Sequence, residues 1–236
     1  AADGRGLVVD VVGEPGIGKS RLVDEAMRDL GDGITIVSAK GGLYSRTTPY
    51  FAVSTMLRRL IGIDRSSTPA SAGRLMSQWV MERAPAMEPW MPLLAIAFAA
   101  DVPSTPEVDR IDPANRAGKL REVVVDLLTA AIDGPLVFVV DDAHRLDEAS
   151  DEVFAAVARR IANRPWLLIS LRWRDHTTFI DALDDRVRVD VGPLAPAEAE
   201  AVARAATAGD PRFDPDDVDD RIARGVTNPP FLLALA

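Results

Sequence analysis

The chain has 236 residues, of which 47% are hydrophobic and 27% are charged, and its formal net charge is −9. This is the composition of a globular domain large enough to bury a sizeable core. The acidic balance, with no basic stripe, argues against direct nucleic-acid binding by this segment, because such binding depends on neutralising phosphates. The absence of cysteine excludes disulfides and cysteine-ligated zinc.

Neither a signal peptide nor a membrane anchor is predicted. The N-terminus enters strand-like sequence without a basic leading region, and the most apolar stretch, 91–100, is too short to span a bilayer. We therefore expect a cytoplasmic segment with no membrane partner. Since the sequence opens almost on a strand and stops inside the apolar run 231–236, we also expect a fragment of a longer chain.

The first predicted strand, 7–12, runs into the most informative motif of the sequence, G-x-x-x-x-G-K-S, and a helix is predicted over 19–30. Strand, glycine-rich loop and helix in this order are typical of the phosphate-binding loop of nucleoside-triphosphate-binding proteins. Glycines let consecutive N–H groups point at phosphate oxygens, and the helix adds its positive dipole end. Lys19 is the expected cation for the β- and γ-phosphates, and Ser20 the expected Mg²⁺ ligand. The predicted nucleotide-binding residues are Gly13, Glu14, Pro15, Gly16, Ile17, Gly18, Lys19, Ser20 and Arg21.

Further apolar runs alternate with helical patterns along the chain. They predict an α/β fold, a P-loop NTPase three-layer sandwich whose central parallel sheet is covered on both faces. Asp112 and Pro113 give one helix an N-cap and a first-turn proline. The later buried strands are expected at 34–38, 136–140, 166–171 and 187–191, and the later helices at 49–61, 114–132 and 148–162.

Two composition shifts suggest the domain organisation. Residues 1–192 are expected to form the ATPase core, with a helical insertion at about 45–112 that has a proline-rich middle with loops. Residues 193–236 are expected to form a C-terminal helical lid, because the sequence turns alanine-rich and helical there.

The predicted strand at 136–140 leads into two carboxylates, Asp141 and Asp142. The carboxyl edge of an open α/β sheet is where ligands bind, so the two acids are expected at that edge. Asp141 is expected to hold Mg²⁺, and Asp142 to orient or deprotonate the attacking water. An acidic N-cap on the following helix is the alternative reading of the pair.

Three further side chains are candidates for roles in the site or lie beside it. Arg172 follows the fourth apolar run and is predicted to be a catalytic residue near the γ-phosphate, although a solvated arginine after a strand fits the same pattern. His144 is expected to pack at a helix start, because phosphoryl transfer to water needs no imidazole beside carboxylate and metal. His176 stands by itself in a polar loop.

Several segments resemble the ATPase domains of bacterial STAND regulators, which are signal-transduction ATPases with numerous domains. These regulators include large LuxR-type transcriptional activators and the cyclase–ATPase fusions of actinobacteria. The resemblance covers nearly the whole chain and is carried by GEPGIGKSRL at 13–22, SRTTPYF at 45–51, DDAHRLDEAS at 141–150, SLR at 170–172 and TNPPF at 227–231.

The resemblance implies a nucleotide switch that rests with ADP bound and exchanges it for ATP on sensing a signal. It implies adenine rather than guanine as the base, with Pro229 packing near the adenine or ribose. Thr227 departs from the family by standing where glycine is usual. The implied partners are ATP, ADP, effector and sensor domains elsewhere in the parent chain, and other copies in an ATP-dependent self-association.

The leading prediction is therefore a Mg²⁺-dependent ATPase that acts as a slow regulatory switch. One alternative is a constitutive ring-forming motor ATPase, which needs an arginine from a neighbouring subunit. Another is a nucleotide-binding scaffold without turnover. The presence of both Asp141 and Asp142 argues against it.

Overall fold

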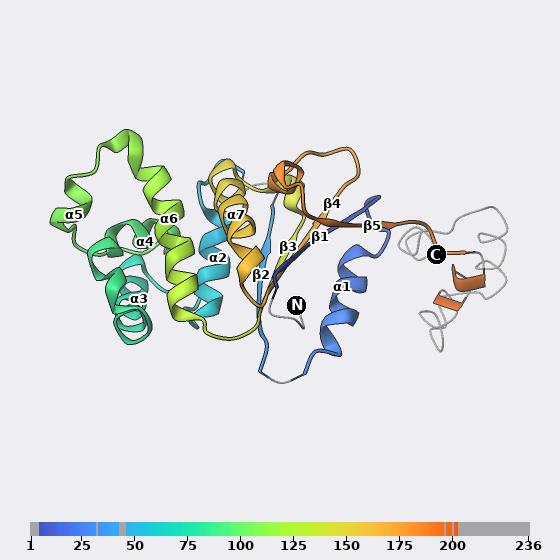
Figure 1. Cartoon of the computed structure of the whole chain (residues 1–236), viewed down its shortest axis with the longest axis horizontal. Helices are drawn as coiled ribbons and strands as arrows, with labels where there is room; N and C mark the ends of the chain where they lie inside the picture. Colours follow the sequence, from blue (N-terminus) through green and yellow to red (C-terminus); the bar gives the residue numbers. More distant parts are fainter. Residues whose placement is uncertain (1–4, 32, 43–45, 196, 200, 203–236) are drawn as a thin grey trace. The chain divides into compact units, whose positions relative to one another are not determined.

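The computed structural model describes residues 5–31, 33–42, 46–195, 197–199 and 201–202. Its centre is a five-stranded parallel sheet with the strand order β2-β3-β4-β1-β5 (Figure 1). In the parallel register of the sheet, Lys40 of β2 pairs with Asp141 of β3, and Val140 of β3 pairs with Ser170 of β4. The predicted α/β fold is thus confirmed. The strands are β1 (Leu7–Gly13), β2 (Thr35–Lys40), β3 (Leu136–Asp141), β4 (Trp166–Arg172) and β5 (Val187–Val191).

The strands differ in burial according to their place in the sheet. In β3 and β4 nearly every residue is buried or half-buried, as expected for strands covered on both faces. The prediction that 187–191 is a buried strand is wrong, because the first four residues of β5 are exposed. Its alternation of valine with charged residues suits its place at the edge of the sheet.

Each predicted helix is present within about two residues of its expected bounds. The Asp112 carboxylate accepts a hydrogen bond of 2.8 Å from Ala114 N, which confirms the predicted cap of α6. Asp147 caps α7 in the same way through Ser150 N at 2.8 Å. The α-helices are α1 (Lys19–Arg28), α2 (Phe51–Leu60), α3 (Pro69–Arg83), α4 (Met91–Phe98), α5 (Pro106–Asp109), α6 (Pro113–Ala131) and α7 (Glu148–Arg160).

The region between β2 and α6 consists mainly of short helices joined by loops. Pro69, Pro85, Pro92 and Pro106 each stand in the first turn of a helix, where a missing N–H costs nothing. Figure 1 shows α3, α4 and α5 on the side of α2 and α6 that faces away from the strands. The prolines therefore start helices here, and the 3-10 helix η1 (Pro85–Trp90) links α3 directly to α4.

The chain divides into two compact units, and both β1 and β5 contribute to each. Unit 1 comprises Ala1–Asp10, Gly31–Arg172 and His176–Val187, and unit 2 comprises Val11–Leu30, Trp173–Asp175 and Arg188–Ala236. The division predicted at 192/193 stays a prediction, because most of 193–236 lies outside the described residues.

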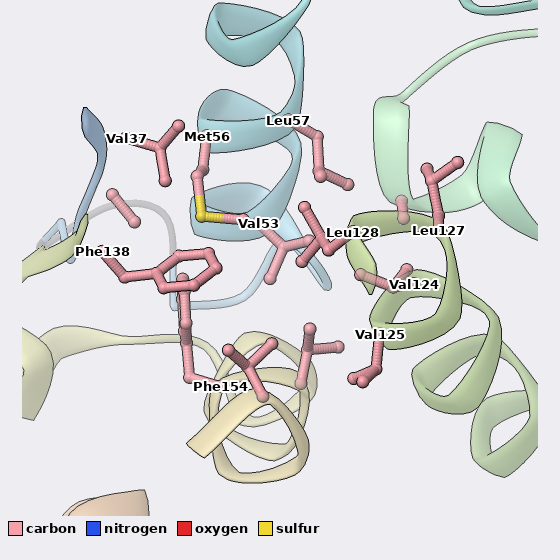
Figure 2. Packing of buried hydrophobic residues seen from close by; sticks show 14 of the residues in the cluster. Val37, Val53, Met56, Leu57, Val124, Val125, Leu127, Leu128, Phe138 and Phe154 are labelled. Carbon is pink, nitrogen blue, oxygen red and sulfur yellow. The ribbon is translucent and has the colours of Figure 1, made fainter. Parts of the chain in front are cut away.

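The main core belongs to unit 1 and lies between β3 and the helices α2, α6 and α7 (Figure 2). Phe138 of β3 and Phe154 of α7 are fully buried, as are Val53 of α2 and Leu128 of α6. Among the described residues, no helix combines the length and the apolar character needed to cross a bilayer.

Candidate nucleotide-binding site

The loop between β1 and α1, in unit 2, has the backbone of an anion-binding turn. Gly16 (φ 71°) and Gly18 (φ 104°) both adopt left-handed conformations, which glycine adopts without the penalty that a Cβ imposes. Gly13 is needed for a different reason, since a Cβ there would lie 2.7 Å from Val191 O on β5. Two of the predicted glycines thus shape the loop, and the third lets β5 approach it.

Lys19 begins α1 and is almost completely buried. Its Nζ donates to Gly13 O at 2.9 Å and to Glu14 O at 2.8 Å. The loop therefore curls around the ammonium group, which is fixed in place before any phosphate arrives. The lysine that the motif predicted as the phosphate cation is positioned by the loop itself.

The N-terminus of α1 is suited to an anion. No acidic side chain lies in its first turn, and Gly18 provides no side-chain cap. The positive end of the helix dipole is thus not neutralised by the helix's own residues. Ser20 and Arg21 are exposed in this first turn, where a bound phosphate would contact them.

The two predicted acids lie in unit 1, at the carboxyl end of β3. Asp141 is the last residue of the strand, and Asp142 follows in a left-handed conformation (φ 51°) that begins a 3-10 turn, η2 (Ala143–Arg145). Asp142 N donates to Asp141 Oδ1 at 3.0 Å, so the backbone turn fixes one carboxylate. Both carboxylates remain partly exposed.

Lys40 is a site residue that the sequence reasoning missed. It ends β2 beside Asp141, and its Nζ lies 3.0 Å from Asp141 Oδ2 and 3.7 Å from Asp142 Oδ2. The hydrogen bond to Asp141 raises the pKa of Lys40 above its usual value, so the ammonium stays charged. The sequence does show a lysine shortly after a predicted strand. Its contact with the acids could be predicted only by knowing that β2 and β3 are neighbours.

Gly41 lets the ends of β2 and β3 come together. Its N–H donates to Asp141 O at 2.9 Å, and a Cβ at this position would lie 2.3 Å from Asp142 O. The backbone of the acid pair is thus held by contacts that only glycine permits.

The donor set fits Mg²⁺, which binds through one or two carboxylates together with substrate phosphates. Among the described residues no group of three or more His, Asp or Glu side chains converges that could hold a metal ion. Asp141 supplies a partly exposed carboxylate, and the cation that now touches it is the ammonium of Lys40.

Arg172 ends β4 and is 3% exposed. Its Nε and Nη2 donate to the two carboxylate oxygens of Asp10 at 2.9 and 2.8 Å, and Nη2 also reaches Asp181 Oδ1 at 2.9 Å. The hydrogen bond to Asp10 raises the pKa of the guanidinium. The catalytic role of Arg172 stays a prediction, and in this structure its guanidinium joins β1, β4 and the 3-10 turn η4 (Phe179–Ala182).

Asp10 is the second residue that the sequence reasoning missed. It is fully buried in the middle of the apolar run of β1. A buried carboxylate requires a partner, so this acid was itself the signal that a buried cation lies opposite.

The chain has two histidines, and their rings meet edge to face. The rings of His144 on η2 and His176 in the β4–η4 loop have their centroids 5.1 Å apart at 61°. The expectation that His176 stands by itself is wrong, whereas His144 is buried beside the acid pair as predicted. Pro229 and Thr227 lie outside the described residues.

Comparison with known families decides the assignment. Residues 1–169 match the model of the AAA ATPase domain. The chain belongs to the AAA ATPase domain family. The loop at 13–20 and the acids Asp141 and Asp142 lie within the matched residues, and Arg172 and Pro229 lie beyond them. The domain is thus a nucleotide-binding ATPase domain, as the sequence predicted. A comparison with curated proteins finds no match.

Solved structures give distant likenesses to this AAA ATPase domain. A STAND protein with a tetratricopeptide repeat sensor from Pyrococcus horikoshii has 15% identity and a TM-score of 0.46, with 98% of this chain and 27% of that chain covered. Drosophila ORC bound to DNA has 13% identity and a TM-score of 0.39, with 96% and 48% covered. The E. coli HORMA:CdnC:Trip13 complex has 12% identity and a TM-score of 0.36, with 92% and 58% covered. The chain thus spans less than two thirds of each, and the assignment rests on the family match.

Proposed function

We propose that this AAA ATPase domain is an ATP/ADP switch that hydrolyses ATP slowly, with Mg²⁺, inside a larger cytoplasmic regulatory protein. The observation that best supports nucleotide binding is the loop before α1, in which Gly16 and Gly18 are left-handed and the carbonyls of Gly13 and Glu14 hold the Lys19 ammonium. Such a loop binds phosphate oxygens through its N–H groups. The switch role rests on the resemblance of the motifs to STAND regulators.

Each site residue has a defined part in the proposal. Lys19 and the N–H groups of the loop from Gly13 to Arg21 bind the phosphates. Ser20 and Asp141 hold Mg²⁺, which supplies positive charge against the charge that develops on the phosphates. Asp142 orients or deprotonates the attacking water. Arg172 neutralises charge at the γ-phosphate once released from Asp10, and Pro229 packs near the adenine or ribose.

Two substitutions test these roles separately. Lys19→Ala is expected to abolish binding of a fluorescent ATP analogue. Asp142→Asn is expected to preserve binding and lose hydrolysis, because asparagine tolerates the left-handed backbone of position 142 but cannot accept a proton. Lys119→Ala, on α6, is the matched control and should leave both properties unchanged. Full ATPase activity in Lys19→Ala would refute the assignment.

The nucleotide that the purified protein carries tests the switch. We expect denaturation to release ADP, as a resting switch requires. Release of GDP would overturn the adenine assignment, and an empty site would favour freely exchanging turnover. A ring-forming motor would instead show hydrolysis per subunit that rises steeply with protein concentration.

A further inference from the structure

A groove in unit 1 lies on the helical region between β2 and α6, a part of the fold that the nucleotide chemistry does not use. It has a volume of about 270 Å³ and is lined by α2, α4, the segment 48–51 and the turn after α2. Segment 48–51 is part of a motif that resembles the STAND family but has no role in the ATPase proposal. The groove is therefore a candidate binding site of its own.

The groove exposes large apolar side chains. Phe51 at the start of α2 is 44% exposed and Ile96 of α4 is 51% exposed. Ala99, which ends α4, also lines the groove and adopts a left-handed conformation (φ 48°) that favours glycine. Its methyl group adds apolar surface there in spite of the backbone strain. Exposed apolar residues that converge on a groove are typical of recognition sites.

Arginines accompany the apolar side chains. Arg58, Arg59 and Arg65 line the groove, and no acidic side chain lines it among the residues that the structure describes. Arg65 makes no hydrogen bond or ion pair within that part of the chain, and Arg59 uses Nη1 for a bond of 3.0 Å to Ser38 Oγ. The groove is thus basic on a chain whose net charge is −9.

Arg58 lines the groove and binds the backbone of the turn after α2. Its Nη2 donates to Asp64 O at 2.9 Å and to Ser67 O at 3.0 Å, which holds the turn after α2 in place. The Asp64 carboxylate accepts hydrogen bonds from Ser66. The basic groups of Arg59 and Arg65 are therefore the ones that remain to meet a ligand.

We propose that this groove binds an acidic peptide segment of a partner protein, in which carboxylates flank a large apolar side chain. The volume is below the roughly 300 Å³ of the smallest typical small-molecule pockets, but it can accept one large apolar side chain as an anchor. Carboxylates on either side of the anchor match the arginines, which also favour encounter with an acidic partner. The site requires neither nucleotide nor hydrolysis.

Fluorescence anisotropy with a labelled peptide of sequence EDLFDE tests the proposal. We expect saturable binding that weakens at high salt, with no binding of the peptides KKLFKK or EDSSDE. Ile96→Asp and Arg65→Glu should each weaken EDLFDE binding about tenfold or more. Met81→Asp and Arg83→Glu are matched controls on exposed positions of α3 outside the groove, and they should bind like the wild type.

A second measurement on the unmodified protein guards against variants that fold poorly. In ¹H–¹⁵N NMR spectra, EDLFDE should shift the amide signals of Phe51, Ile96 and Ala99. Shifts confined to other parts of the chain would overturn the proposal. It would be overturned equally by the absence of EDLFDE binding, by equal binding of KKLFKK, or by wild-type affinity in Ile96→Asp.

Discussion

Arg172 at the end of β4 donates two hydrogen bonds to the carboxylate of Asp10 on β1, from Nε to Oδ1 at 2.9 Å and from Nη2 to Oδ2 at 2.8 Å. The side chains are 4% and 0% exposed. Asp181 on η4 binds the same guanidinium, and Arg186 Nε lies 3.9 Å from Asp10 Oδ2. The carboxylates and guanidinium groups thus balance each other inside unit 1, and losing Asp10 leaves the buried Arg172 guanidinium with less compensating negative charge.

Removing Asp10 should therefore destabilise the fold strongly. We expect Asp10→Ala to lower the free energy of unfolding by about 3 kcal/mol, the order found when one partner of a buried ion pair is lost. Urea unfolding followed by circular dichroism measures this. Asp190→Ala removes a carboxylate that pairs with Arg174 and Arg188 at the surface, and it should change stability little. Equal losses of unfolding free energy in both variants would show that the buried ion pair contributes no more to stability than the surface pairs.

Gly41→Ala should distort the acid pair, because its Cβ would lie 2.3 Å from Asp142 O and 2.9 Å from Arg145 C. These are backbone atoms that cannot rotate away. We expect a loss of about 1–3 kcal/mol in thermal unfolding, as for overpacking, together with a loss of ATP hydrolysis. Gly134→Ala is the control, since no atom lies within 4 Å of its Cβ position, and it should be neutral. A fully active Gly41→Ala would contradict this role.

Lys40→Met should ease Mg²⁺ binding, because the ammonium of Lys40 competes for Asp141 and Asp142. Both the lysine and the carboxylates are partly exposed, so the effect is modest. We expect the Mg²⁺ concentration for half-maximal nucleotide binding to decrease by a factor of about two to five. Lys40→Arg should behave like the wild type, and Lys119→Met controls for the lost charge. A higher Mg²⁺ requirement in Lys40→Met would instead make Lys40 a ligand-positioning residue.

Asp151→Asn should stabilise the protein at neutral pH. Burial on α7 raises the pKa of Asp151, with Glu152, Asp147 and Asp181 adding repulsion, while its Oδ1 accepts a hydrogen bond from Phe179 N at 3.0 Å. Since the folded pKa lies above the unfolded value, the ionised form is disfavoured in the fold. This penalty is absent below about pH 4, the ordinary aspartate pKa, grows as pH rises from there to the folded pKa, and stays constant above it.

Asparagine keeps the acceptor for Phe179 N and removes the charge. Thermal unfolding of Asp151→Asn and wild type should therefore coincide near pH 4 and diverge in favour of the variant towards pH 7. A variant that is less stable than the wild type at pH 7 would contradict this account.

The sequence predicted best the features that are set by residues close to each other along the chain. The loop around Lys19, the acids after β3 and the Asp112 cap are local patterns, and the structure has the loop and the acids where the patterns put them.

Contacts that depend on which strands are neighbours in the sheet could not be predicted from the sequence. Lys40 meets Asp141 only because β2 and β3 are adjacent, and Asp10 meets Arg172 only because β1 and β4 are adjacent. β5 looked buried because its valines resemble a core strand, but its edge position leaves it exposed. The sequence predicted a helical insertion with loops but not where its helices begin, because a proline that ends a helix and one that starts it look alike until the cap is known.

The edge-to-face contact of the two histidines gives the protein an intrinsic spectroscopic reporter. Because the chain has only His144 and His176, every imidazole signal in an NMR spectrum comes from this single contact. One ring belongs to the turn that follows Asp142, and the backbone carbonyl of the other residue accepts a hydrogen bond from Arg172. Ring-current shifts of two residues can thus follow the acid turn and the buried arginine at once, without any label.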